Sequence, residues 1–119
     1  MRGASSRLAA ATISLLSEAK LDFATSGDNA VIAGGGAGTT IRIHRIFFVV
    51  AAATNITFKD GATGLTGAIP MLANGSFVLD FSSEPWFTTS ATNSFVINSS
   101  AGVQLSGRIY YTQGVPPVA

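Results

Sequence analysis

Apolar and polar residues alternate with a period of two over several stretches, the pattern of strands with one buried face. Between 54 and 59, Ile56 and Phe58 would face inward, while Asn55, Thr57 and Lys59 face outward. The same analysis predicts seven strands, over residues 30–33, 40–50, 54–59, 65–69, 76–81, 95–98 and 103–112.

The longest predicted strand, Thr40–Val50, changes character along its length. In its first half Ile41 and Ile43 face one side, and Arg42 and His44 face the other. From Ile46 onward both faces are apolar. We therefore expect the second half to be covered on both sides, with Ile46, Phe48 and Val50 presented to another subunit.

Turn signals separate the predicted strands. They lie at Ser26–Asn29, in the glycine-rich run Gly34–Gly38, at Asp60–Gly61 and at Asn74–Gly75. No convincing helix alternates with the strands, so we predict an all-β fold, an antiparallel β-sandwich or jelly roll of seven to eight strands. Its expected core is Ile43, Phe47, Ile56, Phe58, Phe77, Leu79, Phe95, Val103, Leu105 and Ile109.

Residues 1–29 differ in composition from the rest and hold nearly half of the charged residues. A helix from Ser5 or Ser6 to about Lys20 would have only a thin apolar stripe, and residues 2–16 also have the outline of a short secretion signal. We interpret 1–29 as an N-terminal arm that contacts a neighbouring subunit or a shell. The sandwich domain is then 30–113, and 114–119 form a C-terminal tail.

The composition argues against an enzyme. The 119 residues include no cysteine and one histidine, so they offer no thiol nucleophile, disulfide or zinc site. No lysine follows Gly34–Gly38, as a phosphate-binding loop requires. The acidic residues Asp28, Asp60, Asp80 and Glu84 lack the spacing of a calcium loop. We therefore expect no catalytic residue, no cofactor and no metal.

Charge and hydropathy narrow the choice of partners. The net charge is +1 with no basic stripe, which disfavours nucleic acid, and no apolar run reaches the roughly 18 residues of a membrane helix. Only 11% of residues are charged, and the mean hydropathy is +0.42. Such a chain has little charge repulsion to keep copies apart, so we predict a homo-oligomer, a trimer or a dimer.

Residues that combine charge or aromatic area with an expected surface position are the interface candidates. Most aromatic residues occupy inward positions, whereas Trp86 follows Pro85 in a loop and Tyr110 lies on the polar face of its strand. Exposed tryptophan and tyrosine often dominate binding energy at interfaces. The candidate set is Arg2, Arg7, Arg42, His44, Arg45, Trp86 and Tyr110.

The stretch 40–112 resembles small structural proteins of tailed bacteriophages. The resemblance rests on IRIHRIFFVVAAATNITFKDGATGLTG, PMLANGSFVLDF, SEPWFTTSATNSFVIN and VQLSGRIYYTQ. It implies a jelly-roll-like decoration, or cement, protein on the exterior of the virion, whose partner is the major capsid protein. Two alternatives remain: a tail-fibre or receptor-binding tip domain, and a carbohydrate-binding β-sandwich module.

Overall fold

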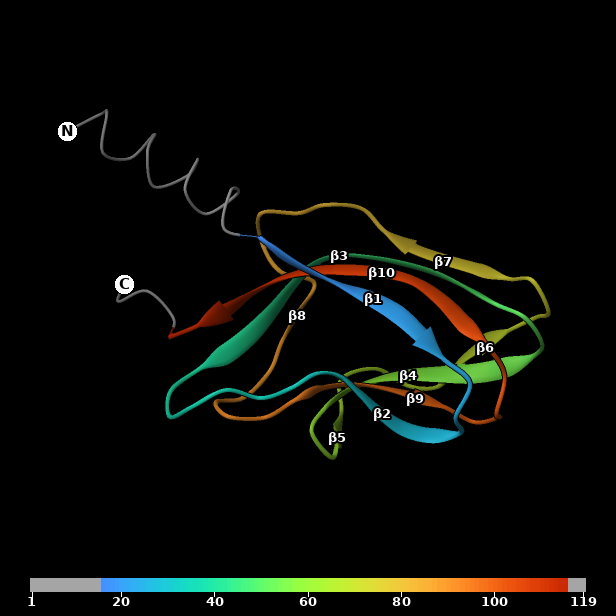
Figure 1. The fold of residues 1–119 in the computed structure, drawn as a ribbon, viewed down its shortest axis with the longest axis horizontal. Coiled ribbons are helices and arrows are strands. Elements are labelled where there is room, and N and C mark those ends of the chain that lie inside the picture. The colour runs from blue at the N-terminus through green and yellow to red at the C-terminus, as the bar shows by residue number, and fades with distance from the viewer. Residues whose placement is uncertain (1–15, 116–119) are drawn as a thin grey trace.

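The computed structural model describes residues 16–115, which form ten strands in two antiparallel sheets packed as a sandwich (Figure 1). The first sheet contains β1 (Ser17–Phe23), β10 (Leu105–Gly114), β3 (Thr40–Val50), β7 (Ser76–Leu79) and β8 (Phe87–Thr88). The second contains β2 (Gly27–Ile32), β9 (Phe95–Ser99), β4 (Thr54–Asp60), β5 (Thr63–Gly64) and β6 (Ile69–Met71). No helix that could span a membrane occurs within 16–115.

The strands pair in a nested order. β1 pairs with β10, β2 with β9, β3 with β7 and β8, and β4 with β5 and β6, always antiparallel. The chain is thus one long hairpin rolled into two sheets, the arrangement of a jelly roll. The predicted all-β antiparallel sandwich is confirmed, although the number of strands is ten and not seven or eight.

The predicted boundary of the arm at residue 29 is wrong for its second half. Residues 17–23 form β1, and β2 begins at Gly27, so both strands belong to the sandwich. In β1 the side chain of Leu21 is only 1% exposed, and Ala19 and Phe23 also pack against the core. The predicted helix therefore does not extend over 17–20. Its earlier part, with Arg2 and Arg7, lies outside the described residues, as do 116–119 of the tail.

The strand predicted over 65–69 is misplaced. The structure has β5 at Thr63–Gly64 and β6 at Ile69–Met71, with Pro70 inside β6 and opposite Asn55. Proline has no N–H to donate, but an edge strand needs ladder bonds on one side only. Because β6 pairs with β4 alone, Pro70 fits there.

A β-bulge in β3 decides which side chains of this strand reach the core. Ile43 lies opposite Tyr111 and Arg45 lies opposite Tyr110, so His44 is an extra residue on β3. The alternation consequently shifts by one position. Ile41 and Ile43 are buried before the bulge, and Ile46, Phe48 and Val50 are buried after it.

The predicted second apolar face of β3 is therefore assigned to the wrong residues. Phe47 and Val49 point away from the core, and the strand is not covered on both sides: Val49 is 45% exposed. The prediction that Phe47 belongs to the core is therefore wrong. Val103 is half-buried, precedes β10 and lies outside the core cluster.

Aromatic rings join the two sheets. Phe58 of β4 has ring centroids at 5.0 Å from Phe87, 5.3 Å from Phe77, 6.1 Å from Phe95 and 6.3 Å from Phe48. The other expected core residues also pack here. Ile43, Ile56, Phe58, Phe95, Leu105 and Ile109 are fully buried, while Phe77 and Leu79 are partly buried against them.

Candidate interaction surface

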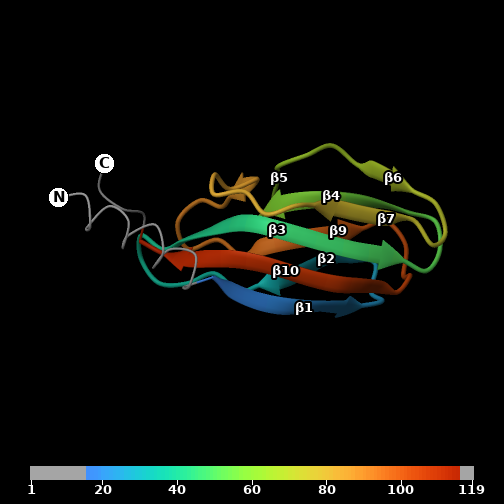
Figure 2. The same cartoon turned by 90° about the horizontal axis from the view of Figure 1, so that it is seen from above.

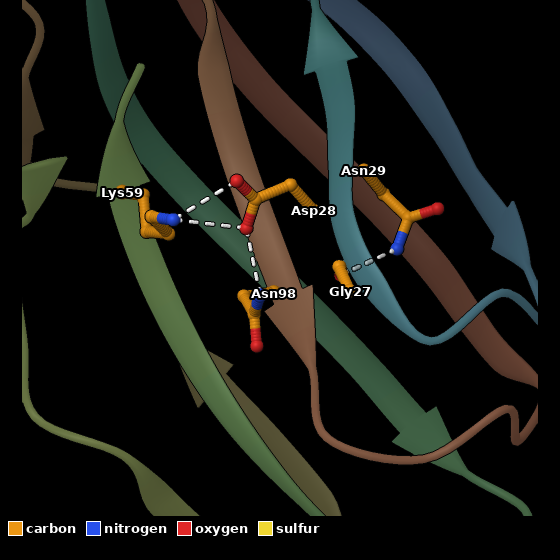
Figure 3. Close-up of polar contacts among 5 residues, drawn as sticks. All are labelled: Gly27, Asp28, Asn29, Lys59 and Asn98. Atoms are coloured by element: carbon orange, nitrogen blue, oxygen red, sulfur yellow. Dashed lines mark hydrogen bonds and ion pairs between the residues drawn. The ribbon is translucent and has the colours of Figure 1, made fainter. Parts of the chain in front are cut away.

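On the outer face of the second sheet, a network of polar side chains joins three strands (Figure 3). Lys59 Nζ on β4 donates to both carboxylate oxygens of Asp28 on β2, each at 2.9 Å, and Asn98 Nδ2 on β9 donates to Asp28 Oδ1 at 2.7 Å. Asn29 Nδ2 donates to the carbonyl of Gly27 at 3.2 Å. The hydrogen bonds from Asn98, and then from Lys59, lower the pKa of Asp28. The three side chains link β2, β9 and β4 through an ion pair with an added hydrogen bond.

The outer face of the first sheet differs because it carries aromatic and aliphatic side chains. Figure 2 shows β1, β10 and β3 side by side in this sheet. Its outward side chains line up across the strands: Tyr110 lies opposite Arg45, and Phe47 lies opposite Val78. We call five of these outward residues the outer strip: Arg45, Phe47, Val49, Val78 and Tyr110. On the same face of β10, Arg108 lies opposite Phe47 and Ser106 lies opposite Val49.

The outer strip combines four aromatic or aliphatic side chains with Arg45, and it is partly exposed. Val78 is 57% exposed, and Phe47 and Tyr110 are half-buried. The guanidinium carbon of Arg45 lies 5.1 Å from the ring centroid of Phe47 and 5.2 Å from that of Tyr110, so the cation is stacked between two rings. The arrangement offers a surface for protein contact.

A second exposed group, which we call the Trp86 corner, consists of Phe81, Pro85 and Trp86 in the segment between β7 and β8. Trp86 is 47% exposed and Phe81 is 45% exposed. Trp86 Nε1 donates to the Asp80 carbonyl at 2.8 Å, and the Trp86 backbone N–H donates to the Ile43 carbonyl at 2.8 Å. The indole is thus held in place while half of its surface stays open.

His44 lies beneath this corner and not at the surface, contrary to our expectation; it is 4% exposed. Its Nδ1 is 2.8 Å from the Ser82 carbonyl, which can only accept, so Nδ1 carries the proton. Nε2 lies 3.1 Å from the Thr112 hydroxyl, and the Phe81 ring stacks on the imidazole with 6.0 Å between the ring centroids. The bulged histidine therefore anchors the segment that carries Trp86.

The structure brings together most of the described candidate residues. Arg45 and Tyr110 belong to the outer strip, and Trp86 gives the Trp86 corner its name. Arg42 donates from Nε to Thr112 Oγ1 at 3.2 Å and from a terminal nitrogen to Thr40 Oγ1 at 2.7 Å. It therefore shares Thr112 with His44. Arg2 and Arg7 lie outside the described residues.

The sequence analysis missed three residues of this surface: Phe47, Val49 and Val78. Phe47 had been assigned to the core, and the two valines had no assigned role. The signal was present in the run Ile46–Val50, where both faces are apolar although only one of them can point into a single sandwich.

Two further observations concern metal binding and similarity to known proteins. Within 16–115, no group of three or more His, Asp or Glu side chains lies close enough to hold a metal ion. Comparisons with models of known protein families, with curated proteins and with solved structures found no match.

Proposed function

We propose that this chain is a structural virion protein that decorates the capsid of a tailed bacteriophage and stabilises it by binding across neighbouring major capsid protein subunits. The resemblance of 40–112 to small phage structural proteins supports the proposal. The unlike outer faces of the jelly roll support it as well. On the outer face of the second sheet, polar side chains bind one another, whereas the outer face of the first sheet presents aromatic and aliphatic side chains.

The observation that carries the proposal is the Trp86 corner. A half-exposed tryptophan with its indole N–H and its backbone N–H both bonded is already ordered before a partner arrives. Ordered aromatic side chains lose little conformational entropy on binding and often dominate the binding energy. We assign the contact with the shell to this corner.

Binding to a shell would stabilise the shell by mass action. A protein that binds assembled capsid subunits, and not free ones, shifts the equilibrium toward the assembled state. An oligomer that contacts several subunits gains further from the effective concentration of its second and third contacts.

The proposal is tested with shells of the phage that carries this gene, prepared without the protein. Wild type should co-sediment with the shells and raise their melting temperature. Trp86→Ala should weaken binding at least tenfold, as expected for the loss of a dominant interface residue. Leu72→Ala is the matched control, because Leu72 is 80% exposed and lies in the turn next to Val50, whereas Trp86 bonds to Ile43 near the other end of β3.

Each outcome is informative. Equal loss of binding in Leu72→Ala and Trp86→Ala would contradict the assignment to the corner. No binding of wild type to the shells would overturn the decoration proposal, and binding to isolated tails in place of shells would favour the tail-fibre alternative.

A further inference from the structure

We infer that β1 pairs with β1 of a second copy of this chain, antiparallel and about a twofold axis at Leu21, so that the first sheets of the two copies form one continuous sheet. The inference concerns the free protein and goes beyond decoration of a shell. It rests on the backbone groups that β1 leaves open, on the features of the other edge strands and on the charges of β1.

The outer side of β1 is an open row of backbone hydrogen-bonding groups. Val50 of β3 makes its backbone bonds to Asn74 and Gly75, on the side of β7. The N–H and C=O of one residue point to the same side of an antiparallel strand, so Leu105, which lies opposite Val50, turns its own groups toward β1 and Phe23. Alternation along β1 then leaves the backbone groups of three residues on the free side, where no strand of residues 16–115 pairs with them: Glu18, Lys20 and Asp22.

The other edge strands carry features that discourage the addition of a strand. Pro70 lies in β6, β7 has four residues, and β5 and β8 have two each. The ladder between β2 and β9 shifts register between Ala30 and Ile32. By contrast, β1 pairs with β10 in unbroken register over all seven of its residues, and Figure 2 shows it at the margin of the first sheet. It is therefore the edge best suited to take up a further strand.

The charges of β1 complement those of a second β1. The side chains of Glu18, Lys20 and Asp22 lie on the outer face and alternate in sign. With the axis at Leu21, Lys20 of each copy lies opposite Asp22 of the other, and in a twofold contact this favourable pair occurs twice. An axis at Lys20 would place Lys20 opposite itself and Glu18 opposite Asp22, and like charges directly opposite are destabilising.

The inner face of β1 also fits an axis at Leu21. Ala19 of one copy then lies opposite Phe23 of the other, a small side chain against a large one. An axis at Ala19 also brings opposite charges together, but it would place Asp22 opposite Leu16. The side chains of Lys20 and Asp22 are 72% and 55% exposed and stay on the solvent-facing side of the sheet after pairing, so the contact buries no unpaired charge.

The contact is small and should be weak. Lys20 and Asp22 of the two copies form two hydrogen-bonded pairs, which exchange about four backbone bonds. Each such bond contributes modestly in water, because it replaces bonds to solvent. We therefore expect a dissociation constant of roughly 10–100 μM.

The first test is sedimentation equilibrium of the full chain and of charge variants of β1. Wild type should show a concentration-dependent dimer. Lys20→Glu and Asp22→Lys should each raise the dissociation constant about tenfold or more, because each places two like-charged pairs in the contact. The double variant, Lys20→Glu with Asp22→Lys, has the net charge of wild type and restores both opposite pairs, so it should dimerise like wild type. Leu72→Glu is the matched control at an exposed site away from β1 and should also dimerise like wild type.

A second test mixes the two single variants. A copy with Lys20→Glu has carboxylates at 20 and 22, and a copy with Asp22→Lys has ammonium groups at both. Native mass spectrometry of the mixture should show the heterodimer in excess over either homodimer. Thermal melts verify that each variant is folded, since the exposed pair of Lys20 and Asp22 contributes little to the stability of one chain.

A wild type that stays monomeric at concentrations on the order of 1 mM would overturn the inference. A dimer that neither Lys20→Glu nor Asp22→Lys weakens would also overturn it and would place the contact away from the edge of β1. A double variant that stays as weak as the single variants would overturn the axis at Leu21. None of these measurements uses shells, so decoration would stand or fall separately.

Discussion

At the scale of single residues, Asp60 is a buried carboxylate that holds a loop to the sandwich. It accepts hydrogen bonds from the Ser90 backbone N–H at 2.9 Å, from the Ser90 hydroxyl at 2.7 Å and from Asn93 Nδ2 at 3.0 Å. Burial alone would raise the pKa of Asp60, but the bonds from Ser90 and Asn93 outweigh it, and the pKa is lowered.

Asp60→Asn should therefore destabilise the protein by about 1–3 kcal/mol at pH 7, because the amide cannot replace every bond that the carboxylate accepts. The folded pKa of Asp60 lies below the unfolded value of about 3.9, so its stabilisation is complete above about pH 4 and is lost as the pH falls through the folded pKa. Urea unfolding at pH 7 and in acid would measure both effects.

The matched control for this prediction is Asp80→Asn, at an exposed position. It should leave stability at pH 7 nearly unchanged. An Asp60→Asn protein that loses as much stability in acid as wild type does would contradict the role of Asp60.

Gly107 is a second residue whose identity follows from its surroundings. It lies in β10 opposite Phe48, and a Cβ at this position would be 1.9 Å from the Phe47 carbonyl oxygen and 2.6 Å from the Phe48 Cα. These are backbone atoms, so no side-chain rotation relieves the clash.

We predict that Gly107→Ala destabilises the protein by at least about 3 kcal/mol, because β10 and β3 must move apart. Gly114→Ala, in the same strand with nothing within 4 Å of its Cβ, should be nearly neutral. Thermal or urea unfolding of the two variants gives the comparison, and equal stabilities would refute the close approach.

At the scale of elements, the bulge in β3 links the core to the surface. It sets Ile46, Phe48 and Val50 toward the core, and it turns Arg45, Phe47 and Val49 outward. The same extra residue, His44, hydrogen-bonds the segment that carries Trp86. The outer strip and the Trp86 corner therefore share one structural cause.

A deletion tests this arrangement. Removing one residue from a strand ordinarily moves the following side chains to the opposite face. Removing His44 should not, because Ile43 and Arg45 already pair with the consecutive residues Tyr111 and Tyr110. We predict that the deletion variant folds and loses about 1–3 kcal/mol for the missing hydrogen bonds, much like His44→Ala.

Deletion of Phe47 is the contrasting variant. It should abolish cooperative folding, since it forces either Phe48 and Val50 outward or Arg45 inward. Circular dichroism and urea unfolding would separate the two deletions. A His44 deletion that fails to fold, while His44→Ala folds, would disprove the regular ladder that we expect.

At the scale of the whole molecule, an aromatic cluster between the sheets holds the jelly roll together. Phe48, Phe77 and Phe87 come from the first sheet, and Phe58 and Phe95 come from the second. Phe58 has its ring within 6.3 Å of the other four. Its packing contributes to the contact between the two layers.

Phe58→Ala should cost about 3–5 kcal/mol, the usual cost of truncating a fully buried phenylalanine. This is a large part of the total stability of about 5–15 kcal/mol expected for a domain. Phe81→Ala, at a position 45% exposed, is the control and should cost at least about 2 kcal/mol less. Similar losses of stability for Phe58→Ala and Phe81→Ala in urea unfolding would show that Phe58 is not the central ring of the aromatic cluster.

The sequence alone determined the features that depend on neighbouring residues. The alternation in 54–59 identified β4, and Asp60–Gly61 and Asn74–Gly75 identified two turns. The structure has positive φ values at Gly61 and Asn74, which these residue types tolerate. Trp86 and Tyr110 were identified as surface candidates from loop chemistry and local pattern, and Arg45 was identified from its charge.

The tertiary structure alone decided the features that depend on a distant partner. Ala19, Leu21 and Phe23 occupy alternate positions of residues 17–23. This segment forms a strand because β10, over eighty residues later, offers an edge for pairing. The bulge at His44 exists only relative to the register of β10, and it selects which apolar face of β3 is buried. Periodicity identifies a strand that has two apolar faces. Only the opposite sheet can cover one of them and leave the other as a surface for binding.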